Sequence, residues 1–382
     1  MKKSHLFLSR PISVLVLLAF LITLPCLESM SDDGIASGMH ALNAPDSLEK
    51  IDVAVFYYVP RDREPLDDWR ERIDDLMVRT QKFHRREFTG QSDFQYTIHP
   101  APFIASAASS GFPQEDANQF YWHIINEVRQ SGEAQSQAGA FPIILVFSDH
   151  NFSPGYDDWT RECDGKGCLF PAPHSDCAGY VRSNGEDRPG SRCGGARSVF
   201  WPEEHIGLGL VTADGWRVPL KGSDCVVYHE GIGHSIGLPH PEPINNSVMG
   251  LAQYEDGLHK AWVDEDQKLE LGWKKEPIDH TDLFSNFIVE HEPHRPIANQ
   301  PVLISAAYPD RFKDGVATAE YQTGLRLPFQ KLEPIAFSKK GGQCRVVWKL
   351  PPLDQGECIA YRVRLQCPDG GSESTWHYLK VR

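Results

Sequence analysis

Residues 229–240 (HEGIGHSIGLPH) constrain the fold of this chain more than any other segment. Three histidines and one glutamate fall within twelve residues, at the end of a helix that we predict over residues 223–236. That helix must end sharply if His240 is to come back to the other two histidines. Gly237 supplies this ending, because a glycine adopts a left-handed backbone without a Cβ clash.

The residue types in this segment indicate a metal site. Neutral imidazoles bind zinc at about 2.0–2.1 Å, and three of them leave a fourth position for water. Zinc lowers the pKa of that water to about 7, and a nearby carboxylate can take its proton. We therefore expect His229, His234 and His240 to bind one catalytic zinc ion, with Glu230 as the general base. A cluster of surface histidines is the alternative, but the two glycines between Glu230 and His234 would then cost roughly 1 kcal/mol each without a reason.

The segment resembles the motif of the metzincin zinc endopeptidases, HExxHxxGxxH followed by a methionine-containing turn. The second half of that motif matches through His234, Gly237 and His240, and residues 246–250 (NSVMG) look like the turn. The resemblance covers roughly residues 229–250. It implies a metzincin-like α/β (α+β) catalytic domain with a mixed sheet, an active-site helix, and a peptide substrate that lies extended along a sheet edge.

The chain departs from the family pattern by one residue, because three residues instead of two separate Glu230 from His234. In a regular α-helix, residues five apart point about 140° apart, so His229 and His234 could not share one ion. A single π-bulge would restore the shared face, and the dipeptidyl-peptidase III family is similar in its HExxxH spacing. A straight helix that uses Glu230, His234 and His240 as ligands is the alternative, and it would leave no obvious base.

The N-terminus predicts export. Three basic residues precede an apolar run at residues 12–24, which is the layout of a signal peptide over residues 1–31. The run is shorter than the roughly 20 residues of a membrane span. A lipoprotein acylated at Cys26 is the alternative, although its neighbours suit that modification poorly. We expect a secreted or otherwise extracytoplasmic chain without a stable membrane span, and residues 32–50 as a polar leader that is either mobile or a propeptide.

The cysteines fit an exported protein. Removing residues 1–31 takes away Cys26 and leaves eight of the nine cysteines, which we expect to form disulfides in an oxidising compartment. Five lie between residues 163 and 225 and three between residues 344 and 367. Both numbers are odd, so the pairing stays open. A structural zinc on the cluster at residues 163–193 is the alternative to disulfides there.

Hydrophobic periodicity divides the rest of the chain into two domains. Residues 51–275 form the catalytic domain, with strands at 51–59, 93–98, 141–147 and 206–212 and helices at 65–87, 115–129, 223–236 and 264–272. Residues 148–198 are rich in glycine, proline, aspartate and cysteine, which predicts a disulfide-rich surface insertion. Its turns at Asp157-Asp158 and Asp164-Gly165 could hold a structural calcium ion, although solvated loop carboxylates are the simpler interpretation.

The C-terminal part has the pattern of an all-β domain. Residues 290–382 contain short alternating strands at 302–306, 316–321, 344–350, 359–367 and 376–381. Several strands at this spacing over about 100 residues are typical of an immunoglobulin-like or fibronectin-like β-sandwich.

Composition narrows the functional classes. The formal net charge of −14 argues against nucleic acid as a partner, because phosphate binding needs a basic surface. We therefore predict a secreted zinc-dependent endopeptidase that acts on a protein or peptide substrate. Two alternatives stay open: a non-catalytic, metal-stabilised secreted binding protein, and a zinc hydrolase that acts on non-peptide amides or esters. The sequence does not indicate the oligomeric state.

Overall fold

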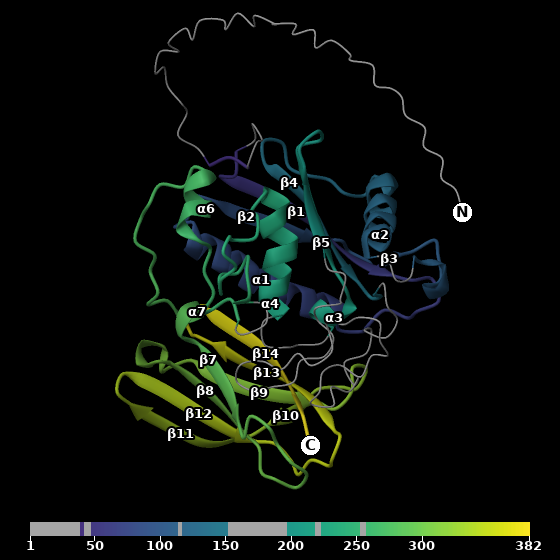
Figure 1. The fold of residues 1–382 in the computed structure, drawn as a ribbon. Coiled ribbons are helices and arrows are strands. Elements are labelled where there is room, and N and C mark those ends of the chain that lie inside the picture. Colours follow the sequence, from purple (N-terminus) through teal and green to yellow (C-terminus); the bar gives the residue numbers. More distant parts are fainter. Residues whose placement is uncertain (1–38, 42–46, 114–116, 152–196, 218–222, 253–256) are drawn as a thin grey trace, which may run out of the picture. The chain divides into compact units, whose positions relative to one another are not determined.

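The chain folds as a mixed α/β protein with one mixed sheet and two antiparallel sheets (Figure 1). The computed structural model describes residues 39–41, 47–113, 117–151, 197–217, 223–252 and 257–382. These residues all belong to one compact unit, Gly38–Arg382. The predicted signal peptide, the predicted calcium turns and most of the predicted insertion lie outside the described residues.

The mixed sheet has six strands in the order β2-β1-β4-β6-β5, with β3 beside β1. The strands are β1 (Lys50–Val59), β2 (Asp93–Ile98), β3 (Phe103–Ile104), β4 (Phe141–Ser148), β5 (Arg197–Trp201) and β6 (Ile206–Val211). All pair in parallel except β5, which runs antiparallel to β6. The four predicted strands of this region are confirmed. The short β3 was not predicted, and β5 begins within residues that we interpreted as a surface insertion.

Helices cover both faces of this sheet (Figure 1). Alternate residues of β1 point to opposite faces, so Val53 packs in one core with α1 (Trp69–Glu87) and α4 (Ser223–Tyr228), and Phe56 packs in another with α2 (Ala117–Ser131). Helix α1 starts later than we predicted, because the Leu66 amide donates to the Tyr57 hydroxyl at 3.1 Å instead of joining a helical turn.

Shorter helices connect these elements. They are α3 (Ala213–Trp216), α6 (Glu265–Glu270) and α7 (Leu283–Asn286), with single 3-10 turns at Ser109–Gly111 and Asp310–Phe312. Helix α6 confirms the predicted helix at residues 264–272, shortened at both ends. None of the described helices is long and apolar enough to cross a membrane.

Residues 288–380, which we call the antiparallel lobe, form two four-stranded sheets. One sheet has the order β11-β12-β8-β7 and the other β10-β9-β13-β14. The strands are β7 (Ile288–Glu292), β8 (Leu303–Pro309), β9 (Val316–Gln322), β10 (Gln330–Leu332), β11 (Pro334–Lys340), β12 (Gln343–Lys349), β13 (Cys358–Gln366) and β14 (Ser372–Lys380). Both sheets send apolar side chains into one core, which includes Trp348 and Tyr361. All five predicted strands are confirmed, and β7, β10 and β11 are additional.

The structure gives no support to the predicted disulfide framework, since Cys225, Cys344 and Cys367 form no disulfide with one another. Cys344 and Cys367 are buried in the core of the antiparallel lobe as thiols, and burial raises the pKa of both. Cys225 is buried in the core beneath the mixed sheet. The predicted cysteine cluster at residues 163–193 lies outside the described residues.

The end of the predicted polar leader is part of the core instead of a mobile segment. Met39, Ala41 and Leu48 are buried, and the His40 amide donates to the Leu271 carbonyl at 2.8 Å. These residues therefore pack beside the end of α6.

Candidate metal centre

The helix over residues 223–236, which we call the metal-site helix, carries the first two predicted ligands and changes its winding at His229. Helix α4 continues into a π-helical turn over His229–Gly233 and a 3-10 turn over His234–Ile236. The π-bulge that we predicted from the extra residue is therefore confirmed. The wider turn places His229 and His234 on the same side of the helix, which a straight α-helix could not do at this spacing.

This helix lies directly on β6, because glycine occupies the point of contact. A Cβ atom at Gly209 would come within 2.8 Å of the Glu230 carbonyl oxygen. Any larger residue in β6 at this position would push the π-helical turn away from the sheet. This close contact between Gly209 and Glu230 sets how far His229 and His234 lie from the mixed sheet.

The helix ends at Gly237, as predicted. Gly237 has a φ of 93°, its amide donates to the His234 carbonyl at 2.9 Å, and the Leu238 amide donates to the Gly233 carbonyl at 3.0 Å. The left-handed residue reverses the chain. As a result His240 returns to the two histidines on the helix.

The three histidines converge through their Nε2 atoms. The Nε2 atom of His240 lies 3.1 Å from that of His229 and 3.2 Å from that of His234. Three nitrogens bound to one tetrahedral ion at about 2.0–2.1 Å would be about 3.3 Å apart, so the spacing fits a shared ion. Among the described residues, this is the only group of three or more such side chains that could hold a metal ion.

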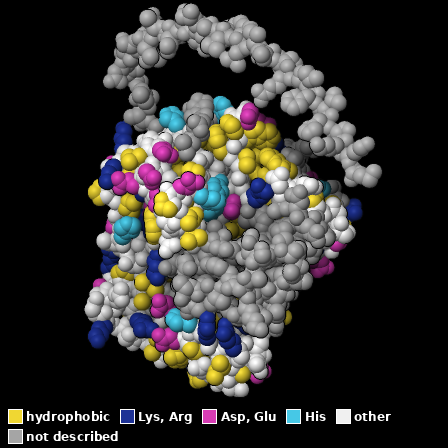
Figure 2. Space-filling model, in the orientation of Figure 1, with side chains coloured by type: hydrophobic (Ala, Val, Ile, Leu, Met, Phe, Trp, Pro, Cys, Tyr) yellow, Lys and Arg dark blue, Asp and Glu magenta, His cyan; other side chains and the backbone are white. Residues whose placement is uncertain are grey.

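The centre opens to the surface on one side. His229 is buried, His234 is half-buried and His240 is exposed. Figure 2 shows histidine side chains at the surface of the face that carries α4. An ion held by these three residues could therefore be reached by a ligand from solvent.

Hydrogen bonds determine which ring nitrogen of His229 and of His234 is available to bind a metal ion. The Nδ1 atom of His229 donates to the Val248 carbonyl at 2.8 Å, and that of His234 donates to the Leu238 carbonyl at 2.6 Å. A carbonyl can only accept, so Nδ1 carries the proton and Nε2 keeps its lone pair. Burial lowers the pKa of His229 to about 3 and that of His234 to about 4, so both are neutral at neutral pH.

These observations agree with the requirements of a metal ligand set. The three imidazoles can hold one metal ion, and imidazole suits zinc, copper, iron and nickel. The straight-helix alternative, with Glu230 as a ligand, is not what forms, because Glu230 is not part of the converging group.

Glu230 directly follows His229 in the chain, but its carboxylate is not part of the converging group. Its Oε2 atom accepts a hydrogen bond from the Ser198 hydroxyl at 3.1 Å. Burial raises the pKa of Glu230 to about 8, although the Ser198 hydrogen bond and the charge of Arg197 oppose that rise. Without a metal ion this carboxyl group would hold its proton at neutral pH, whereas a cation bound to the three histidines would favour the ionised carboxylate.

Two further contacts steady the centre from segments far apart in the sequence. The Val248 amide donates to the Trp262 carbonyl at 2.8 Å, which holds the carbonyl that orients His229. The Gln267 side chain on α6 donates to the Pro239 carbonyl at 2.8 Å, directly before His240.

We did not predict Ser198 and Gln267 as parts of this centre. The β-branched and aromatic run after Ser198 (Val199, Phe200 and Trp201) was a signal for strand β5, which places Ser198 against Glu230. No local signal marks Gln267, because its contact depends on how α6 packs.

Comparisons with known proteins add no assignment. Neither a protein-family model nor a curated protein matches the sequence. A cycloalternan-forming enzyme from Listeria monocytogenes matches 24% of this chain at 15% identity, with a TM-score of 0.21, and the match spans 9% of that enzyme. The archaellum periplasmic stator protein FlaG from Sulfolobus acidocaldarius matches 24% of this chain and 98% of its own, at 9% identity and a TM-score of 0.15.

A third solved structure is similarly distant. A nucleoside hydrolase-related hypothetical protein from Saccharophagus degradans matches 86% of this chain and 100% of its own, at 10% identity and a TM-score of 0.19. Similarities this weak bear on neither fold nor function. The centre must therefore be interpreted from its own chemistry.

Proposed function

We propose that this chain is a secreted zinc-dependent endopeptidase with a metzincin-like active site. The observation that carries the proposal is the convergence of three histidine Nε2 atoms, two of them from a helix that also carries Glu230 and whose π-turn accommodates the extra residue. The motif is then an HExxxHxxGxxH variant of the metzincin pattern.

The surrounding elements support this proposal. The active-site helix packs on the mixed sheet, which has five parallel strands and the antiparallel β5, and Met249 is buried beneath the helix in the turn that we compared with the methionine turn. We further propose that the two sheets of the antiparallel lobe form an immunoglobulin-like or fibronectin-like sandwich.

The proposed reaction assigns a separate role to each residue. Zinc, when bound, would act as a Lewis acid on the substrate carbonyl and lower the pKa of a water molecule. The Ser198 hydroxyl donates a hydrogen bond to Oε2 of Glu230. The other carboxylate oxygen, Oε1, would then accept the proton of the attacking water. Glu230 would then pass this proton to the leaving amine nitrogen.

A peptide substrate is favoured by the position of β5. This strand is the last in the order of the mixed sheet, so among the described strands it pairs only with β6. Ser198 lies on β5 and contacts the proposed base. An extended peptide could add to the other side of β5 as a further strand, main chain to main chain, and would then pass the metal centre.

The test combines metal content with hydrolysis. The wild-type protein should bind about one zinc ion per chain, cleave a denatured protein, and lose activity with a chelator. Glu230→Gln should keep the zinc and lose at least about 100-fold in kcat, because general-base catalysis contributes about 100- to 10,000-fold. Equal activity of both proteins would contradict the role of Glu230.

The same experiment separates the alternatives. Zinc without peptide cleavage, but with hydrolysis of simple amides or esters, would favour a different zinc hydrolase. Zinc without hydrolysis of any substrate would favour a metal-stabilised binding protein.

Export is proposed from residues 1–31 alone. Expression of the full chain with N-terminal sequencing of the exported product should give a start after Ser31. A product that retains residues 1–31 would contradict cleavage.

A further inference from the structure

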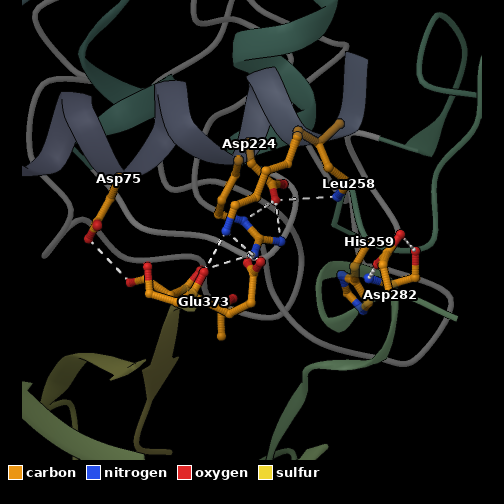
Figure 3. A network of polar contacts seen from close by, with 12 residues as sticks. Asp75, Asp224, Leu258, His259, Asp282 and Glu373 are labelled. Atoms are coloured by element: carbon orange, nitrogen blue, oxygen red, sulfur yellow. Dashed lines mark hydrogen bonds and ion pairs between the residues drawn. The ribbon is translucent and has the colours of Figure 1, made fainter. Parts of the chain in front are cut away.

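Arg79 on α1 connects three elements of the fold. Its Nε and Nη2 atoms both lie 2.8 Å from Oδ2 of Asp224 on α4. On its other side, Nη1 donates to the Ser374 carbonyl on β14 at 3.0 Å and lies 3.8 Å from Oε2 of Glu373. Figure 3 shows this network, with Asp224 on one side and Glu373 on the other.

The Asp224 end of this network belongs to the metal-site helix. Asp224 lies in the first turn of α4, whose last residue precedes His229. Its Oδ2 atom also accepts the Leu258 amide at 3.3 Å. Leu258 lies on the segment that continues to Trp262, whose carbonyl accepts the Val248 amide. Arg79 therefore holds the start of the ligand-bearing helix and the segment that supports the methionine turn.

The Glu373 end belongs to the antiparallel lobe. Glu373 is buried on β14 and also accepts a hydrogen bond from Lys82 of α1 at 2.5 Å. The Arg79 guanidinium further lies over the Phe284 ring, 5.2 Å from its centroid. The Arg79 side chain thus connects the antiparallel lobe to the start of the metal-site helix.

The ion pairs of Arg79 with Asp224 and Glu373 are buried, so they can hold α4 in position relative to β14. Arg79, Asp224 and Glu373 are each less than 10% exposed. Burial alone would disfavour the charged guanidinium, but the charges of Asp224 and Glu373 outweigh it and raise the pKa of Arg79. Loss of the arginine would leave a buried Asp224 charge without its ion pair, which is costly unless α4 moves towards solvent.

We propose that Arg79 is a positioning residue of the metal centre, through which the antiparallel lobe holds the ligand-bearing helix. The lobe is then required for the full metal affinity of the three histidines, in addition to any role in binding a partner. This inference rests on the metal binding in the proposed function and is independent of peptide hydrolysis.

The test compares Arg79→Met with Arg362→Met as a matched control. Both arginines are 5% exposed, and Arg362 on β13 also pairs with α1 through Glu71, at 3.1 Å. The ion pairs and cation–π contacts of Arg362 are to Glu71, Glu320, Phe329 and Trp376, which all lie outside α4. The full chain is titrated with Co²⁺, and the affinity and the visible absorption spectrum are measured. Circular dichroism confirms that each variant is folded.

We expect Arg79→Met to bind Co²⁺ about tenfold more weakly, at the low end of the 10- to 100-fold effects of partners closer to a metal. Its visible bands should also shift, because the ligand geometry changes. Arg362→Met should stay within about twofold of wild type, with an unchanged spectrum. Unchanged affinity and spectrum in Arg79→Met would overturn the inference, as would equal weakening by both variants.

A milder variant keeps the test decisive if Arg79→Met does not fold. Glu373→Gln removes the charge on the β14 side without touching α4, and it should weaken Co²⁺ binding by about threefold. Wild-type affinity in Glu373→Gln would overturn the coupling to the antiparallel lobe. A wild-type chain that binds no metal would overturn both this inference and the proposed function, whereas metal binding without peptide cleavage would overturn the endopeptidase alone.

Discussion

Gly233 lies directly against the Met249 side chain. A Cβ atom at position 233 would come within 2.3 Å of the Met249 sulfur and 2.8 Å of its terminal carbon. Met249 is fully buried, so its side chain would have to repack within the core to make room for a methyl group. This contact sets the distance between the π-helical turn and the residues beneath it, including Val248, which orients His229.

The first prediction uses this contact. Gly233→Ala should reduce the free energy of unfolding by about 1–3 kcal/mol, because a methyl group is forced into a filled space. Met249→Ala alone should also destabilise the protein, through a cavity. In the double variant the methyl group enters that cavity, so the loss should be smaller than the sum of the two single losses. Urea denaturation of all four proteins measures this, and additive losses would contradict the contact.

The second prediction concerns the exposed ligand. His240→Ala should lower the zinc affinity by at least about 100-fold, since removal of a ligand should cost more than loss of its outer hydrogen-bond partner. His240 is exposed, so the stability of the metal-free protein should change little. His280→Ala is the control, because His280 is also exposed and lies outside the converging group. Zinc content after dialysis measures both, and retention of zinc by His240→Ala would contradict the ligand set.

The third prediction concerns the end of the metal-site helix. Gly237 has a positive φ of 93°, which costs about 1–3 kcal/mol for a residue with a Cβ atom. Gly237→Ala should lose about that much stability and should also bind metal more weakly, because His240 follows the reversed chain. Gly237→Asn should lose less, since asparagine tolerates this conformation better. Thermal denaturation and metal titration of both variants would decide, and equal losses would contradict the explanation.

The fourth prediction concerns pH and His84. This histidine is fully buried on α1, where its ring atoms contact the Tyr228 hydroxyl at 3.1 Å and the Ser92 hydroxyl at 2.8 Å. Burial lowers its pKa from 6.5 to about 3. Below about pH 6.5, His84 is protonated in the unfolded chain but stays neutral in the folded chain. The free energy of unfolding therefore falls as the pH falls towards 3.

The expected slope from His84 is roughly 1.4 kcal/mol per pH unit within that window. His84→Gln keeps hydrogen-bonding groups but cannot be protonated, so its stability should fall less between pH 7 and pH 5. The difference between the two proteins isolates His84 from the other buried histidines. Urea denaturation at several pH values measures it, and parallel pH profiles would contradict the prediction.

Much of the fold could be predicted because its strands carry strong local patterns. The apolar run at Phe141–Ser148 and the alternating residues of β13 both identified strands within a residue or two. Strand β5 was missed because it begins within residues dominated by glycine, aspartate and cysteine. Strand β11 was missed because every residue in it is exposed, so no buried face leaves an alternating pattern.

The sequence alone identified the three converging histidines as candidate ligands and predicted the π-bulge and the helix end, because these follow from spacing within residues 229–240. Only the tertiary structure decided what holds them: the Val248 carbonyl, the Ser198 hydroxyl, and Arg79 between Asp224 and β14. Helical geometry is set by neighbours along the chain and is therefore encoded locally. These other contacts join residues far apart in the sequence, so they exist only once the sheets and helices have packed.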